Sequence, residues 1–131
     1  MINFGTISTA KITPRALMSP CVDEAKARVV AIAARSKSRA EEFAKWHGIS
    51  RVYDSYDEVI ADDETNALYI PLPISMHKDW TIKALRAGKN VLCEKSFASN
   101  ALEAKEMEAA GAETGLVLMD AFHYRYHPVF I

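Results

Sequence analysis

The sequence has no hydrophobic run that approaches the roughly 20 residues needed to cross a bilayer, and its N-terminus carries no signal-peptide pattern. Cysteine is scarce, since Cys21 and Cys93 are too few and too far apart for a disulfide framework or a zinc site. Neither charge is in excess, because 16 basic residues face 17 acidic ones. This balance argues against a dedicated nucleic-acid binder, which carries a basic stripe. We therefore expect a cytoplasmic chain with reduced thiols, no membrane segment and no nucleic-acid partner.

Glycine is also scarce, with 5 residues in 131, and the shortage matters most near the N-terminus. A strand-like run is followed there by a loop and a helix start, the corner at which G-x-G-x-x-G motifs seat a pyrophosphate. Ser8, Ala10 and Thr13 stand at the three glycine positions, and Gly5 lies inside the predicted strand, too early to make the turn. Two interpretations stay open, a phosphate loop without its glycines and a plain strand-to-helix corner. The residues of this stretch alone favour the plain corner.

The sequence does contain a regular alternation of short apolar runs and longer helix-like segments. This order predicts an α/β fold, a doubly wound parallel six-stranded sheet of the Rossmann type in three αβα layers, as one domain over residues 1–131. The strands are predicted at residues 2–7, 28–34, 51–53, 67–70, 90–93 and 115–122, with helices between them. The predicted helix N-caps are Thr13, followed by Pro14, then Ser55, Ser75, and Ser99 or Asn100.

Basic residues follow the second predicted strand, where NAD-binding folds usually place an acid for the ribose. Arg35, Ser36, Lys37 and Arg39 stand there instead. Arginine forms forked, charge-assisted hydrogen bonds to phosphate, and the Ser36 hydroxyl adds a further donor. If a dinucleotide binds, these residues favour NADP over NAD. The alternative is an ordinary solvated helix start, although a helix N-terminus prefers acids.

Two more strand ends carry polar residues. In "YIPLPISMH", two prolines form a rigid turn and His77 falls in the first turn of the next helix, as either a surface residue or a catalyst. In "VLCEKSF", Glu94 and Lys95 follow a strand that looks buried. A desolvated lysine can exchange a proton or hold a substrate oxygen. The alternative is an ordinary Glu–Lys pair at a solvent edge.

The last stretch, "DAFHYRYHPVF", places aromatics, Arg125 and two histidines after the final strand. His123 and His127 are four residues apart but lack the acid of a known metal motif, so we predict no metal site. We expect the aromatic residues to pack against whatever covers this end of the sheet.

Together these stretches resemble the N-terminal domain of the glucose-fructose oxidoreductase, inositol dehydrogenase and rhizopine-catabolism (Gfo/Idh/MocA) family. The resemblance extends over nearly the whole chain and is greatest for the branch of dihydrodiol and xylose dehydrogenases, which use NADP. It implies hydride transfer between a nicotinamide cofactor and a sugar- or polyol-type alcohol or carbonyl. The matching stretches are "FGTISTAKI", "AARSKSRAEEFAKWHGI", the block from "YDSYDEV" to "CEKSFA", and "DAFHYRYHP".

The resemblance also implies roles for individual residues. Lys95 matches the catalytic lysine of a Glu-Lys-Pro motif, which positions or protonates the substrate oxygen, and Glu94 approaches the nicotinamide ribose. Arg125 reaches the nicotinamide side, and Arg35 contacts the adenosine 2′-phosphate. "STAKIT" aligns with the family's phosphate loop, which now favours a phosphate loop over a plain corner. The other implied cofactor-binding residues are Ser8, Thr9, Ala10, Lys11, Ile12, Ser36, Arg39, Tyr56, Leu72, Pro73, Ser75 and His77.

The chain also departs from the family pattern. Ser8 replaces a glycine, Ile74 stands where the family often has Asn, and Ser96 replaces the proline after Lys95. Family members continue with a C-terminal substrate domain that these 131 residues lack. We therefore expect the chain by itself to bind NADP(H) weakly and to turn over little or no substrate.

Two alternatives remain beside the oxidoreductase half. The first is a non-catalytic nucleotide-binding or self-associating module, in which exposed aromatic residues at positions 122, 124, 126 and 130 form an apolar patch and give a homo-oligomer. The second is an S-adenosylmethionine enzyme on a similar sheet. The basic residues after the second strand disfavour the second alternative, because an acid usually holds the ribose hydroxyls there.

Overall fold

The structure, a computed structural model, describes residues 1–131 and alternates strands with helices. The strands are β1 (Ile2–Ile7), β2 (Ala27–Ala33), β3 (Arg51–Val52), β4 (Ala67–Ile70), β5 (Asn90–Cys93) and β6 (Leu118–Asp120). The helices are α1 (Ser19–Asp23), α2 (Lys37–His47), α3 (Tyr56–Ala61), α4 (His77–Arg86) and α5 (Ala101–Thr114). Shorter helical turns lie at Pro14–Met18, Ile74–Met76, His123–Tyr126 and Pro128–Phe130.

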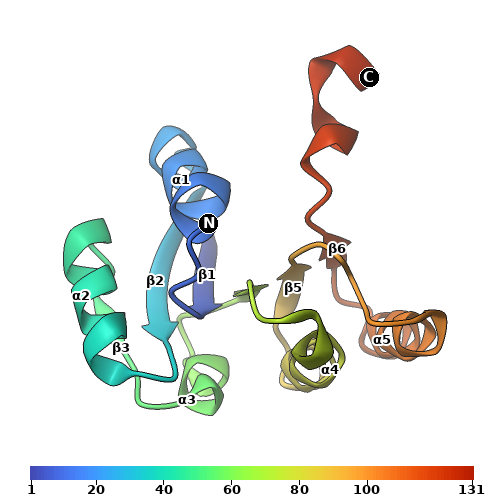
Figure 1. The fold of residues 1–131 in the computed structure, drawn as a ribbon, viewed down its shortest axis with the longest axis horizontal. Coiled ribbons are helices and arrows are strands. Elements are labelled where there is room, and N and C mark those ends of the chain that lie inside the picture. Colours follow the sequence, from blue (N-terminus) through green and yellow to red (C-terminus); the bar gives the residue numbers. More distant parts are fainter.

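All six strands form one parallel sheet in the order β3–β2–β1–β4–β5–β6 (Figure 1). The predicted six-stranded, doubly wound α/β fold is therefore confirmed. Strand order reverses between β1 and β4, because the chain first builds outward to β3 and then returns to the other side of β1. Ligands of such sheets bind beyond the carboxyl ends of the strands at this switch point.

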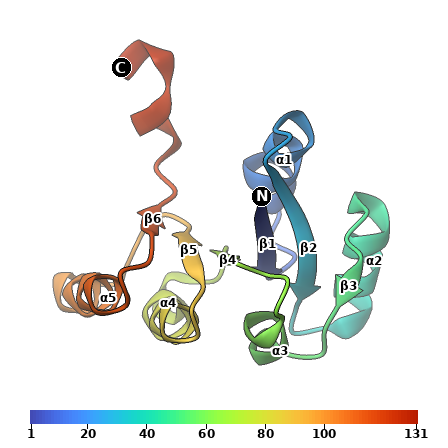
Figure 2. The same cartoon turned by 180° about the vertical axis from the view of Figure 1, so that it is seen from behind.

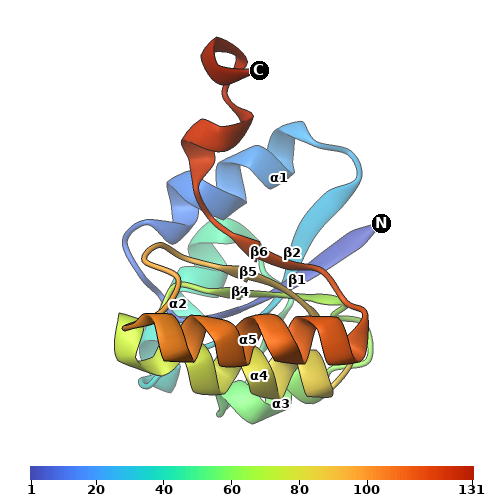
Figure 3. The same cartoon turned by 90° about the vertical axis from the view of Figure 1, so that its right-hand side faces the viewer.

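Two apolar cores hold the helices on opposite faces of the sheet. The smaller core joins Met18 before α1 and Ala40 and Ala44 of α2 to Ile32 and Ala34 at the end of β2. The larger core joins side chains of α3, α4 and α5 to the central strands. Figure 3 shows α3, α4 and α5 side by side below the sheet and α1 above it. The chain after β6 rises on the side of α1, as the view from behind also shows (Figure 2).

Local sequence explains most of the helix ends. Ser55 makes a capping box with Glu58 at the start of α3, as its position predicts. Asn100 rather than Ser99 caps α5. Thr13 occupies the predicted N-cap position before Pro14, although its side chain makes no capping bond. The prediction for Ser75 is wrong, because Ser75 lies inside the helical turn Ile74–Met76 and Met76 stands at the N-cap of α4.

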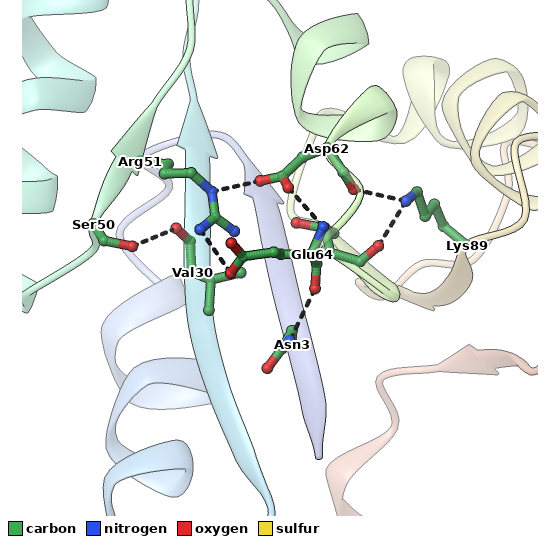
Figure 4. Close-up of polar contacts among 8 residues, drawn as sticks. Asn3, Val30, Ser50, Arg51, Asp62, Glu64 and Lys89 are labelled. Carbon is green, nitrogen blue, oxygen red and sulfur yellow. Dashed lines mark hydrogen bonds and ion pairs between the residues drawn. The ribbon is translucent and has the colours of Figure 1, made fainter.

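A polar network ties the amino-terminal edge of the sheet together, opposite the switch point (Figure 4). The guanidinium of Arg51 donates from Nε to Asp62 Oδ2 at 2.8 Å and from Nη1 to Glu64 Oε2 at 2.9 Å. The buried ammonium of Lys89 donates to the carbonyl oxygens of Asp62 and Thr65 at 2.8 and 2.6 Å. Burial raises the pKa of Asp62, but the hydrogen bonds from Arg51 and from the Glu64 amide outweigh it and leave this pKa below its ordinary value.

This network predicts a loss of stability in acid. A lowered folded-state pKa means that ionised Asp62 contributes stability above its ordinary value near 4, and that the contribution is lost as pH falls through the folded pKa. We expect Asp62→Asn to lower the free energy of unfolding by about 1.5–3 kcal/mol at pH 7, the range for hydrogen bonds to charged groups. The difference from the parent is expected to narrow towards about pH 3. Urea unfolding at both pH values measures the gap.

The matched control for this experiment is Glu64→Gln. Its side chain is the outer, largely exposed partner of Arg51, so we expect a change below about 1 kcal/mol. A gap for Asp62→Asn that stays the same at both pH values would contradict the assignment.

Candidate functional site

The loops that follow the parallel strands all meet at one edge of the sheet. The loops after β1 and β4 flank the switch point, the loop after β2 lies beyond β1, and the loops after β5 and β6 lie beyond β4. Most residues predicted to bind the cofactor lie in these loops, whereas Arg39, Tyr56 and His77 lie near the starts of α2, α3 and α4, which follow β2, β3 and β4. The fold therefore gathers most of the predicted set, distant in sequence, along one edge.

The loop after β1 turns without a residue in the left-handed conformation. Positive φ angles occur at Gly48, Gly88 and Gly115, and at no residue that is not glycine. The loop is closed instead by a hydrogen bond from the Thr13 amide to the Ala10 carbonyl at 3.0 Å. The replacement of glycine by Ser8 thus imposes no backbone strain on this turn. Residues 8–10 are half-buried, whereas Lys11 and Ile12 are exposed.

The basic residues after β2 differ in their partners. Lys37 forms an ion pair with Asp54 at 2.6 Å. The exposed side chains of Arg35 and Arg39 make no ion pair and no hydrogen bond within the chain. Ser36 accepts from the Arg39 amide at 3.5 Å as the N-cap of α2, so its hydroxyl has a structural task as well. Two uncommitted guanidinium groups at a helix start suit an anionic ligand.

Contacts from other elements join these arginines to the remaining site. Arg39 lines a cavity of about 210 Å³ together with Thr9 of the loop after β1 and with Phe43 of α2. Burial raises the pKa of Tyr56, and the positive charge of Arg35 lowers it. Arg39 therefore lies beside Thr9, another residue of the predicted site.

His77 contacts the main chain of the loop after β4. Leu72 is buried, and Pro73 and Ser75 are exposed. His77 is fully buried, and its ring nitrogens lie 2.7 Å from the Leu72 carbonyl oxygen and 2.9 Å from that of Ser96. His77 is thus not a surface residue, and its nitrogens are occupied by main-chain oxygens. A direct cofactor contact of His77 stays a prediction.

Glu94 is buried directly beyond β5 and is held by two donors. The hydroxyl of Tyr69 in β4 donates to Glu94 Oε1 at 2.7 Å, and the Lys95 amide donates to Oε2 at 3.1 Å. Burial and this hydrogen bond raise the pKa of Tyr69, which therefore stays a donor. The Lys95 side chain is exposed and makes no ion pair, and the Lys95–Ser96 peptide bond is cis. The site therefore presents a fixed carboxylate beside a free ammonium.

Sequence reasoning missed Tyr69 and Asp120. Burial and the charge of Glu94 raise the pKa of Asp120, whose Oδ1 is buried without a hydrogen-bond partner. Both residues line a cavity of about 170 Å³ with Glu94 and with His123, whose Nε2 lies 3.8 Å from Glu94 Oε1. The available signal was a polar side chain inside or at the end of a strand otherwise made of apolar residues.

The segment after β6 is less tightly joined to the site than predicted. Arg125 is exposed and lines a different cavity, along α5. The aromatic residues of this segment are exposed too, and their packing against a cover of this end of the sheet stays a prediction. Phe122, Tyr124 and Phe130 instead contact one another, with ring centroids 5.6 and 5.7 Å apart.

The strand order and the loops at the switch point define a Rossmann-type domain. A sequence model described as "Oxidoreductase family, NAD-binding Rossmann fold" (GFO_IDH_MocA) matches residues 2–122. The chain belongs to this oxidoreductase family, which confirms the resemblance seen in its motifs. No helix of the chain is long and apolar enough to span a membrane.

Individual relatives cover nearly the whole chain. It is 39% identical over 126 residues to the D-xylose 1-dehydrogenase (NADP(+)) 2 of Haloferax volcanii, which covers 96% of this chain and 38% of that protein. It is also 39% identical to the scyllo-inositol 2-dehydrogenase (NADP(+)) IolU of Bacillus subtilis, over 99% of this chain and 39% of that protein.

A solved structure shows the same fold. KijD10, a 3-ketoreductase from Actinomadura kijaniata in complex with NADP and TDP-benzene, superposes with a TM-score of 0.92 at 35% identity. The match covers 97% of this chain and 39% of that one. The chain thus spans about two fifths of the length of these relatives.

Proposed function

We propose that the chain binds NADP(H) and forms the cofactor half of an oxidoreductase that acts on a sugar- or polyol-type alcohol or carbonyl. The observation that carries the proposal is the pair of guanidinium groups without partners, Arg35 and Arg39, beside the loop after β1. Guanidinium groups bind phosphate in forked geometry, and a 2′-phosphate is the feature that separates NADP from NAD. The NADP named for the xylose and inositol dehydrogenases and in the KijD10 complex supports this choice.

The residues of the switch point fit the parts of such a cofactor. Backbone N–H groups of residues 8–12 precede a helical start, where phosphate binds well. Tyr69 and the Lys95 amide hold the Glu94 carboxylate in a fixed orientation, suited to accepting hydrogen bonds from a ribose. The nicotinamide supplies or accepts the hydride when it is bound. The free Lys95 ammonium holds the substrate oxygen or gives it a proton.

We further propose that full activity requires chain beyond these 131 residues. The helices α1 and α2 pack against β2 and β3, whereas no α-helix covers the same side of β5 and β6, where the chain after β6 rises (Figure 1). Leu92 and Met119 line the cavity of about 170 Å³ that also contains Glu94, and Met119 is 38% exposed. Hydride transfer needs close alignment of the reactants, and an uncovered site supplies less of it. We therefore expect these residues alone to turn over little substrate.

The second candidate function is a non-catalytic module that associates with itself. The contacting and exposed rings of Phe122, Tyr124 and Phe130 favour it, because exposed apolar clusters mark interaction surfaces. Light scattering at increasing concentration tests this candidate, and a monomer at every concentration counts against it.

We also propose that the chain is cytoplasmic, where its two free cysteines stay reduced.

Calorimetric titration of the chain with NADPH and with NADH tests the leading proposal. We expect measurable binding of NADPH and at least tenfold weaker binding of NADH, since one charge-assisted contact is worth that much. Tighter binding of NADH would refute the assignment of Arg35 and Arg39. Absence of binding by both cofactors would favour the non-catalytic module.

A further inference from the structure

The imidazole of His77 is enclosed by main-chain oxygens from two different loops. Nε2 lies 2.7 Å from the carbonyl oxygen of Leu72, in the loop after β4. Nδ1 lies 2.9 Å from the carbonyl oxygen of Ser96 and 3.3 Å from that of Phe97, in the loop after β5. The side chain is fully buried, so water does not replace either contact. His77 thus bridges the two loops that carry Leu72 and Lys95.

A carbonyl oxygen only accepts hydrogen bonds, so the number of bonds depends on the protons of the ring. The neutral imidazole has one N–H and donates on one side only, leaving a nitrogen lone pair directed at an oxygen on the other side. The imidazolium has two N–H groups and donates to both loops. Because a buried polar atom without a partner is costly, the bridge is complete only in the protonated ring.

The charged side chains near His77 either form ion pairs with other residues or are exposed to solvent. Lys78, next to His77 on α4, forms an ion pair with Glu106 of α5 at 3.3 Å. Asp79 of α4 and Lys95 of the loop after β5 are exposed to solvent, which screens their charges. None of these side chains makes a hydrogen bond to the ring.

The two adjacent strands contribute the buried titratable groups. Burial raises the pKa of Cys93 at the end of β5 to about 12, so its thiol is uncharged. Burial and the charge of Glu94 raise the pKa of Asp120 at the end of β6, whereas the charge of His77 lowers it.

We propose that His77 is a positioning residue that sets the spacing of the loops after β4 and β5, and that the loss of its proton releases one loop and weakens NADP(H) binding. This inference rests on the proposed function, because both loops belong to the proposed cofactor site. In this role the ring acts through the main-chain carbonyl groups of Leu72 and Ser96. It therefore makes the cofactor site sensitive to pH.

The first test uses the cofactor-free chain and NMR. The nitrogen signals of the His77 ring are followed over a pH series from about pH 5 to about pH 8. The amide signals of Ile74 and Phe97 are followed in the same samples. We expect the ring to pass from two N–H groups to one and the amides to shift with the same midpoint. A ring that keeps one protonation state throughout, or amides that do not follow it, would overturn the proposal.

The second test measures NADPH affinity over the same pH range in the parent and in two variants. In His77→Asn the side-chain amide keeps a hydrogen-bond donor near the position of Nδ1. In His77→Gln the side-chain amide keeps a donor near the position of Nε2. Neither amide side chain titrates. We expect the NADPH affinity of the parent to fall about three- to tenfold as pH rises, which is the value of one hydrogen bond. This fall is expected in addition to any change that the two variants show. A change shared by all three proteins belongs to the 2′-phosphate, whose own pKa is near 6.

His127→Gln is the matched control, because His127 lies in the C-terminal segment away from both loops. It is expected to keep the pH profile of the parent. Equal profiles for the parent and the two His77 variants would overturn the proposal even if all of them bind NADPH. Failure of the parent to bind NADPH would refute the proposed function instead. The NMR experiment then tests, without the cofactor, whether the protonation of His77 controls the two loops.

Discussion

Replacing Arg35 and Arg39 together by alanine is expected to weaken NADPH binding at least about 100-fold and to change NADH binding little. Both guanidinium groups are exposed and without partners in the chain, so they are free to bind a phosphate. Each charge-assisted hydrogen bond contributes about 1.5–3 kcal/mol, and two of them correspond to roughly 10²- to 10⁴-fold in affinity. Calorimetric titration of parent and variant with both cofactors measures the effect.

Lys37→Ala is the matched control for this experiment. Lys37 belongs to the same basic stretch, but its ammonium is paired with Asp54, so we expect less than about a threefold change. Arg35→Lys tests the geometry, because lysine keeps the charge and loses the planar fork. An equal loss for NADPH and NADH in the double variant would show that the arginines bind a part that both cofactors share.

Gly5→Ala is expected to destabilise the chain by about 1–3 kcal/mol, the usual cost of an extra methyl group in a packed core. Gly5 lies inside β1, on the strand that packs against Val59 of α3. A Cβ there would lie 2.5 Å from Val59 Cγ1, 3.1 Å from Thr65 Cγ2 and 3.4 Å from Leu68 Cδ1. Urea unfolding monitored by circular dichroism measures the change in the free energy of unfolding.

Gly111→Ala is the matched control, with an expected effect of opposite sign. Its Cβ would meet Leu118 side-chain atoms at 3.5 and 3.7 Å, which is ordinary contact, and the position lies within α5. Alanine is favoured over glycine inside a helix by about 0.5–1 kcal/mol, so we expect a gain of up to that size. If Gly5→Ala were as stable as the parent, close packing of α3 on β1 would not explain this glycine.

Much of the fold follows from local patterns in the sequence. The apolar runs that predict β1, β4 and β5 coincide with the observed strands, and the second run is displaced by one residue. Gly48 ends α2 in the left-handed conformation, as its position after the apolar face predicts. The last strand is shorter than predicted, Leu118–Asp120, because its neighbour β5 offers only residues 91–93 for pairing.

The sequence located the loops of the candidate site but misjudged some roles within them. Ser8 stands where the motif has a turn glycine, yet the turn after β1 closes without a positive φ angle. Tyr69 was overlooked because its strand reads as uniformly apolar, and the partner of its hydroxyl, Glu94, lies 25 residues away. His77 was read as a surface residue or a catalyst because nothing local reveals that two loops close over its ring.

The sequence by itself determined the order of strands and helices, the family and the basic character of the loop after β2. These properties depend on residues near one another in the chain, whose periodicity and charge are directly readable. The tertiary structure alone decided which strands become neighbours, and therefore that Tyr69 meets Glu94, that Gly5 lies under α3 and that His77 joins two loops. Such contacts depend on chain segments brought together by burial of the apolar faces, which local sequence does not specify.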